Sequence, residues 1–120
     1  MRKPVAIITC ICLAIAALTA SLATADTTKT IKVGDDWFQS SSPRVPRVTV
    51  RQNTIVRFKF VGNDVHNVIG YRGQAQRNKF ESPIKSSGYY NKRMTTRGTF
   101  TIICDIHGAY NQSMKLVVTR

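Results

Sequence analysis

Residues 54–61 alternate between apolar and basic side chains at their centre, and this pattern restricts the fold more than any other feature of the chain. In an extended strand the apolar residues of this segment share one face, while Arg57 and Lys59 share the other. Residues 99–104 alternate in the same way and place Cys104 on the inward face at the end of the strand. After residue 25 no apolar stripe of helical spacing and useful length occurs, so the pattern predicts an all-β domain.

Several further short segments have strand patterns and are separated by turn-forming residues. They are residues 30–33, 47–50, 67–71, 89–94 and 115–119. About seven strands of this length predict a β-sandwich. The stretch from Arg72 to Gly88 is polar and contains Pro83, so we expect a long surface connection with room for one helical turn. No repeat or interdomain linker divides the chain.

The N-terminus has the three parts of an export signal. A basic head at residues 1–3 precedes a small and apolar run over residues 5–20, and the small residues Ala23, Thr24 and Ala25 follow. We expect cleavage after Ala25, which leaves residues 26–120 as a single domain. The apolar run is short for a membrane span, which needs roughly 20 residues. The sequence therefore predicts a periplasmic, extracellular or cell-surface protein with no transmembrane segment after cleavage.

Cysteine and histidine are scarce in the predicted domain. Cys10 and Cys12 lie in the signal and would be removed with it, which leaves Cys104 without a partner. Because exported proteins normally pair their cysteines, an unpaired thiol is either a buried bystander or a metal ligand. His107 follows Cys104 by three residues, and His66 is the only other histidine. A thiolate suits Cu(I) and imidazole suits both oxidation states, so this set indicates copper.

The order of these motifs resembles that of the plastocyanin-like cupredoxins over most of residues 29–119. The shared features are His66 followed by Asn67, a long connection, the pattern Gly-x-Phe-x-x-x-Cys-x-x-His over residues 98–107, and Met114 before a final strand. The resemblance implies a Greek-key β-sandwich with one type 1 copper ion that alternates between Cu(I) and Cu(II). It also implies three strong ligands, namely His66, Cys104 and His107.

The resemblance further implies roles for residues around these ligands. Asn67 would bridge the two ligand-bearing loops, and Asp105, where the family usually has a small hydroxyl or apolar residue, could change the potential or the hydrogen bonding. Met114 is the expected axial ligand, although residues 108–113 separate it from the second histidine by a longer interval than is common. Gln112 is a competing axial donor through its amide oxygen, and Met94 is a more remote one.

The predicted function is single-electron transfer between redox partners, not enzymatic catalysis. In this family electrons usually enter at the exposed edge of the second histidine, here His107. Gly108, Ala109 and Tyr110 either surround that edge as an apolar docking patch or, in the case of Tyr110, close the loop over the core. Residues 26–120 carry sixteen basic and six acidic residues, a net charge of about +10, which predicts an acidic partner protein or anionic surface. We expect a monomer.

Three other functional classes compete with this prediction. A copper carrier or store would use similar ligands but tends to offer exposed, methionine-rich sites, and only Met94 and Met114 follow residue 25. A basic binding module lacks a recognisable nucleic-acid motif, and export makes nucleic acid an unsuitable target. An enzyme would need further groups, such as an open zinc position with a general base or ligands for a second copper.

Overall fold

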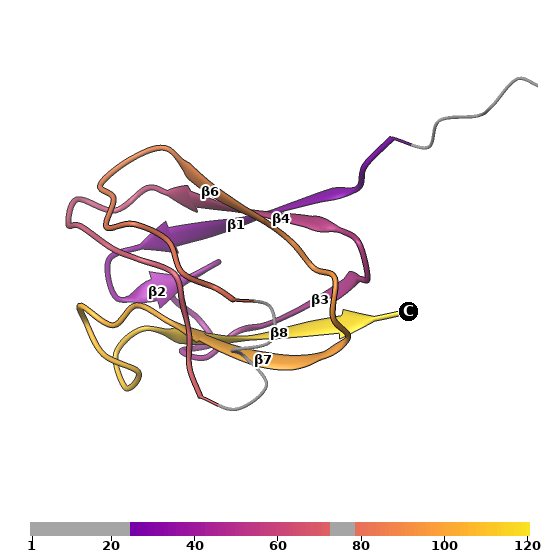
Figure 1. Cartoon of the computed structure of the whole chain (residues 1–120). Helices are drawn as coiled ribbons and strands as arrows, with labels where there is room; N and C mark the ends of the chain where they lie inside the picture. Colours follow the sequence, from indigo (N-terminus) through magenta and orange to yellow (C-terminus); the bar gives the residue numbers. More distant parts are fainter. Residues whose placement is uncertain (1–24, 73–78) are drawn as a thin grey trace, which may run out of the picture.

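Two four-stranded sheets face each other in the computed structural model, which describes residues 25–72 and 79–120 (Figure 1). One sheet has the order β2-β1-β4-β6 and the other β3-β8-β7-β5. The described residues form no helix, and the predicted all-β Greek-key sandwich is confirmed. The strands are β1 (Thr28–Gly34), β2 (Trp37–Phe38), β3 (Arg47–Arg51), β4 (Ile55–Phe60), β5 (Ile69–Gly70), β6 (Tyr89–Arg93), β7 (Gly98–Ile103) and β8 (Ser113–Thr119).

The alternation in β4 and β7 sets the two inner faces of the sandwich. In β4 the residues at positions 56, 58 and 60 are buried, and Arg57 and Lys59 are exposed, as predicted. In β7 Phe100 and Ile102 are buried, and the next inward residue on the same face, Cys104, is buried directly after the strand. Each large apolar side chain buried in this way contributes about 1.5–3 kcal/mol. The core thus holds the end of β7 in place.

Strand direction brings several connections to one end of the molecule. β1 runs parallel to β4, with Val33 opposite Phe60, so the segments that follow both strands leave at the same end. β7 and β8 are antiparallel, and the loop between them lies at that end as well (left in Figure 1). The chain segments that carry the candidate ligands are therefore neighbours in space although they are distant in sequence.

The long connection before β6 packs against the core in its described part. Phe80 is buried, and its ring lies edge-on to Phe58 with the centroids 6.4 Å apart. Bridges join Glu81 to Ile69 and Lys85 to His66. The sequence predicted room for one helical turn in this connection. Residues 79–88 contain no such turn, and residues 73–78 lie outside the described residues. The described part of this connection is thus held against β5 and against the segment that contains His66.

Two strands differ from the sequence prediction. β5 has two residues instead of the five expected, because the backbone before it bonds to the long connection: Val68 N donates to Ser82 Oγ, and Ser82 N donates to Val68 O. β2 is not among the strands predicted from the sequence, and it pairs with β1. Trp37 of β2 lies over Gly34, where any Cβ would fall within 2.1 Å of the indole ring. Gly34 is therefore required for this close approach.

The predicted signal peptide, with Cys10 and Cys12, covers residues 1–25, and residues 1–24 lie outside the described part of the chain. It therefore stays a prediction. No helix among the described residues is long and apolar enough to cross a membrane.

Candidate metal centre

One thiol and two imidazoles converge where the segments after β4 and β7 meet. His66 and Cys104 are fully buried, and His107 in the β7–β8 loop is half-buried. Cys104 Sγ lies 3.4 Å from His107 Nδ1 and 3.9 Å from His66 Nδ1. The three potential ligand atoms all lie within 4.8 Å of one another. The structure thus brings together the three strong ligands predicted from the sequence.

These separations suit a single small metal ion. For bonds of about 2.0–2.1 Å to nitrogen and about 2.3 Å to sulfur, bond angles of about 100–130° place the two ligand atoms about 3.3–3.9 Å apart. The two measured sulfur–nitrogen distances fall in that interval. A thiolate with two imidazoles is also the donor set of electron-transfer copper sites. The residues present therefore fit a copper ion.

Asp35 fixes the orientation and tautomer of the His66 ring. Its Oδ1 lies 2.9 Å from His66 Nε2, and its carboxylate accepts 3.0 Å hydrogen bonds from the backbone N–H groups of Asn63 and Asp64. The bonds from Asn63, then Asp64, then His66 lower the pKa of Asp35 to about 2, so the carboxylate is ionised near neutral pH. An ionised carboxylate accepts a hydrogen bond from Nε2–H, and in the neutral ring this leaves the Nδ1 lone pair facing Cys104.

Gly62 provides the space for this contact. A Cβ at position 62 would lie 2.2 Å from Asp35 Oδ1 and 2.8 Å from His66 Nε2. Both distances are shorter than real Cβ contacts, and both atoms belong to the hydrogen bond that holds the imidazole. Glycine at this position is therefore part of the support for the candidate ligand.

Asn67 joins the segment of His66 to the segment of Cys104. Its Nδ2 donates to Asp105 Oδ1, and its Oδ1 accepts from the backbone N–H of Asp105 at 3.0 Å. Asn67 is buried and Asp105 is exposed. Asp105, which departs from the plastocyanin-like sequence pattern, is therefore the partner in both hydrogen bonds. Its carboxylate faces the amide of Asn67.

The β7–β8 loop closes through backbone hydrogen bonds. Gly108 N donates to Cys104 O at 2.9 Å, and Cys104 N donates to Gln112 O at 3.2 Å. Gly108 has a φ of 84°, a conformation that other residues rarely adopt, so a glycine is needed at this turn. Tyr110 is 79% exposed and its ring lies beneath the guanidinium of Arg44. Tyr110 therefore lies on the outside of the loop and does not close it over the core.

The three candidate axial donors have different surroundings. Gln112 is fully buried, and its Oε1 lies 3.2 Å from His66 Nδ1. Met114 is fully buried in β8 opposite Ile102 and belongs to the hydrophobic core cluster. Met94 follows β6 and pairs with Thr54 before β4, at the opposite end of the sandwich from the three strong ligands. The prediction of Met114 as the axial ligand remains a prediction.

Solved structures of plastocyanin and amicyanin share this architecture. Oxidised plastocyanin from the fern Dryopteris crassirhizoma matches with a TM-score of 0.60 and 19% identity, over 76% of this chain and all of that chain. A Cu(I) form of an amicyanin mutant matches with a TM-score of 0.62 and 21% identity, over 78% of this chain and 84% of that one. The chain has the plastocyanin-like cupredoxin fold. No protein-family model and no curated protein matches its sequence.

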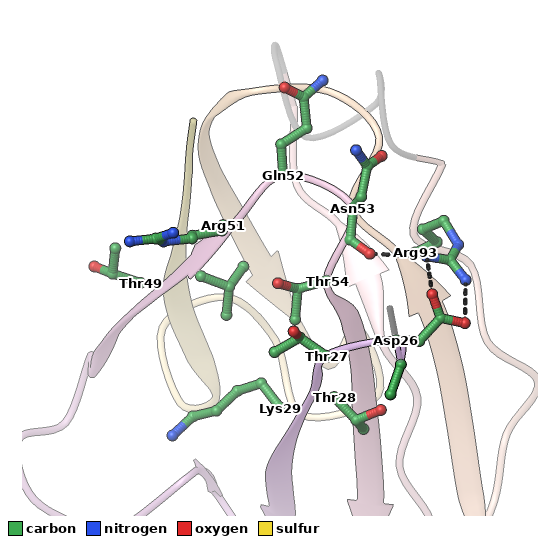
Figure 2. A pocket seen from close by; sticks show the side chains of 12 residues that line it. Asp26, Thr27, Thr28, Lys29, Thr49, Arg51, Gln52, Asn53, Thr54 and Arg93 are labelled. Atoms are coloured by element: carbon green, nitrogen blue, oxygen red, sulfur yellow. Dashed lines mark hydrogen bonds and ion pairs between the residues drawn. The ribbon is translucent and has the colours of Figure 1, made fainter. Parts of the chain in front are cut away.

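A pocket lies at the end of the sandwich opposite the candidate ligands (Figure 2). The ends of β3 and β6 and the start of β1 line it, together with the turn before β4. Arg93 donates to both carboxylate oxygens of Asp26 and to Asn53 O there. The pocket includes no histidine or cysteine, so it is separate from the candidate metal centre.

Sequence reasoning about this cupredoxin fold missed two residues of the site. Asp35 and Gly62 belong to the turn-forming residues between the predicted strands, and the sequence analysis assigned neither of them a role at the site. A signal was available, because the Gly34-Asp35 and Gly62-Asn63-Asp64 turns follow strands that were both predicted. The missing information was that these strands are parallel neighbours, which places their two exits side by side.

Proposed function

We propose that the protein is a mononuclear type 1 copper protein that carries single electrons. His66, Cys104 and His107 are its strong ligands. The observation that supports this proposal is the convergence of one buried thiol and two imidazoles at the end of a β-sandwich. The oxidised plastocyanin and Cu(I) amicyanin structures share the fold, which adds support for copper in this role.

Copper bound at this site supplies one-electron exchange between Cu(II) and Cu(I). The protein residues hold the ligand atoms in fixed positions by burial and by hydrogen bonds between Asp35 and His66 and between Asn67 and Asp105. Such support keeps the ligands from moving when the charge of the site changes. Because the half-buried His107 is the most exposed of the three ligands, its ring is the proposed route for the electron.

The partner in this proposal is an acidic redox protein or an anionic surface. Residues 26–120 carry a net charge of about +10, which would steer an acidic partner toward this protein and make the association rate fall with added salt. Ile106 and Tyr110 are exposed beside His107 in the sequence and offer apolar contact area. The proposed location is the periplasm or the cell exterior, where the predicted signal would send the protein.

Copper carriage or storage is the second candidate function. A carrier releases its ion readily, which an exposed site allows. Here the thiol and one imidazole are fully buried, and the two methionines of the described residues, Met94 and Met114, are fully buried as well. These burials favour retention of the ion and therefore electron transfer.

The first experiment is the visible absorption spectrum of the purified protein after addition of Cu(II), before and after ascorbate. The proposal predicts an intense thiolate-to-copper band near about 600 nm that the reductant bleaches and that air or ferricyanide restores. Zinc loading provides the control, because Zn(II) fits the same ligands and gives no such band. A folded protein that stays colourless with copper would contradict the proposal, and rapid loss of the band to a Cu(I) chelator would favour copper carriage.

A further inference from the structure

We propose that Gln112, not Met114, is the axial ligand, and that its amide oxygen biases the site toward Cu(II). This inference rests on the proposed copper site. The amide is fully buried, and its Oε1 lies 3.2 Å from His66 Nδ1. In the chain, residues 108–111 separate it from His107, and Gln112 O accepts the hydrogen bond of Cys104 N that closes the ligand loop.

Two carbonyl groups decide which atom of the amide faces the ligands. Gln112 Nε2 donates to Gly34 O at 2.7 Å and to Trp37 O at 3.0 Å. Only the nitrogen can satisfy these two acceptors, so the oxygen must point the other way, toward His66. The β1–β2 hairpin thus holds the amide in one orientation, from a part of the chain that carries no ligand.

The arrangement of lone pairs at the centre calls for a cation. With Nε2–H donated to Asp35, His66 Nδ1 presents a lone pair, and Gln112 Oε1 presents another only 3.2 Å away. Two acceptors at that distance repel each other unless a proton or a metal ion lies between them. Cys104 Sγ, 3.9 Å from the same nitrogen, is a further donor facing this space. Gln112 Oε1 is therefore a fourth donor atom of the site.

An amide oxygen and a thioether have opposite effects on the two copper oxidation states. Thioether sulfur is a soft donor that favours Cu(I), whereas carbonyl oxygen suits the harder ion. Glutamine at the axial position therefore stabilises Cu(II) and lowers the reduction potential relative to methionine. A tenfold change in the ratio of Cu(II) to Cu(I) affinity corresponds to about 59 mV for one electron.

A second inference rests on different contacts and concerns Asp35, which we expect to lower the reduction potential as Gln112 does. We infer that it is a positioning residue that also stabilises Cu(II) through His66. Its carboxylate contacts His66 Nε2 at 2.9 Å, and no lysine or arginine of the described residues forms an ion pair with it. Negative charge held beyond a ligand makes the ring a stronger donor and favours the more positive ion.

The test of Gln112 compares Gln112→Met with Met114→Leu in the copper-loaded protein. We expect Gln112→Met to lower the ratio of Cu(II) to Cu(I) affinity at least tenfold, which raises the reduction potential by about 59 mV or more. The absorption and electron paramagnetic resonance spectra should change as well. Met114→Leu conserves volume and should leave both unchanged. A shifted potential and spectrum in Met114→Leu would overturn the assignment even if Gln112→Met fails to fold.

The test of Asp35 uses Asp35→Asn, with Asp26→Asn at the opposite end as the matched loss of one carboxylate. Asparagine has the same shape and removes the charge, but its single oxygen can accept from only one of the two N–H groups that now bond to different carboxylate oxygens. We expect a raised potential with the thiolate band retained, and no change for Asp26→Asn. Equal potentials for the wild type and Asp35→Asn would overturn this inference. A wild-type protein without the band would instead refute the proposed copper function itself.

Discussion

The two ends of the sandwich are both built from turns and polar residues, yet they differ in how those residues are paired. At the ligand end, His66 and Gln112 are fully buried, and their polar atoms contact Asp35, Gly34 and Trp37. At the opposite end, the pocket in Figure 2 is open, and its Asp26–Arg93 ion pair is exposed. The comparison indicates that burial, not polarity, distinguishes the candidate ligand end from the pocket end.

Physical chemistry explains why this difference matters. Apart from His66 Nδ1 and Gln112 Oε1, which face each other, every buried side-chain nitrogen and oxygen of the described residues has a hydrogen-bond partner. Removing one member of a buried network leaves its partner desolvated and unpaired, which costs about 1–3 kcal/mol. An exposed ion pair exchanges protein contacts for water contacts at little net change. Substitutions at the ligand end should therefore have larger effects than substitutions at the pocket end, and the predictions below test that order.

Cys104→Ser should have the largest effect on the ligand end. Serine is close in size to cysteine but supplies no thiolate, so the band near about 600 nm should disappear completely while the β-sheet circular dichroism persists. Copper titration with visible and far-ultraviolet detection checks both. A residual intense band in the variant would show that the band does not arise from the Cys104 thiolate and would contradict its assignment as a ligand.

Gly62→Ala should weaken both the fold and the copper site. The new Cβ would overlap Asp35 Oδ1 and His66 Nε2, so the ring must move, and we expect a loss of about 1–3 kcal/mol in unfolding free energy together with weaker copper binding. Denaturant unfolding and a copper competition assay measure the two quantities.

Gly88→Ala is the matched control for that substitution. A Cβ at position 88 has no atom within 4 Å, although its φ of 82° adds backbone strain of about 1–2 kcal/mol. It should therefore lower stability without changing copper affinity in the folded protein. Equal losses of copper affinity in both alanine variants would refute the specific role of Gly62.

Asn67→Ala should have a smaller effect on folding and a clear one on copper. It removes two hydrogen bonds to Asp105 that join the two ligand-bearing segments, at a cost of about 1 kcal/mol each. Copper affinity should fall by about 10–100-fold, as for other residues that support metal ligands. Asp105→Ala separates the contributions: if the contact is the cause, the double variant should bind copper about as well as Asn67→Ala.

The fold and the cluster of three candidate ligands could be predicted from the sequence because their signals are largely local. Alternation in residues 54–61 and 99–104 predicts β4 and β7, and the spacing of Cys104 and His107 predicts a metal loop. Asp35 could not be assigned in this way, because its contact with His66 depends on β1 and β4 being parallel neighbours.

The orientation of Gln112 is likewise a property of the fold and not of local sequence. It depends on two carbonyl groups more than seventy residues earlier in the chain. Met114 has the inward parity of a final strand, which predicts burial correctly but does not distinguish core packing from metal binding. Local pattern therefore identifies which side chains are buried, while the pairing of distant strands decides which of them face the ligands.

Asp26→Asn should have the smallest effect and tests the pocket end of the comparison. The hydrogen bonds and charge of Arg93 lower the pKa of Asp26 below its ordinary value. The stabilisation by this pair is therefore present at pH values above the ordinary carboxyl pKa and is lost as the pH falls through the lowered value. Melting temperatures of the wild type and Asp26→Asn should differ slightly at neutral pH, converge in acid, and converge also at high salt. A difference as large as that for Gly62→Ala would mean that the exposed end contributes as much to stability as the buried one, and the contrast between the two ends would fail.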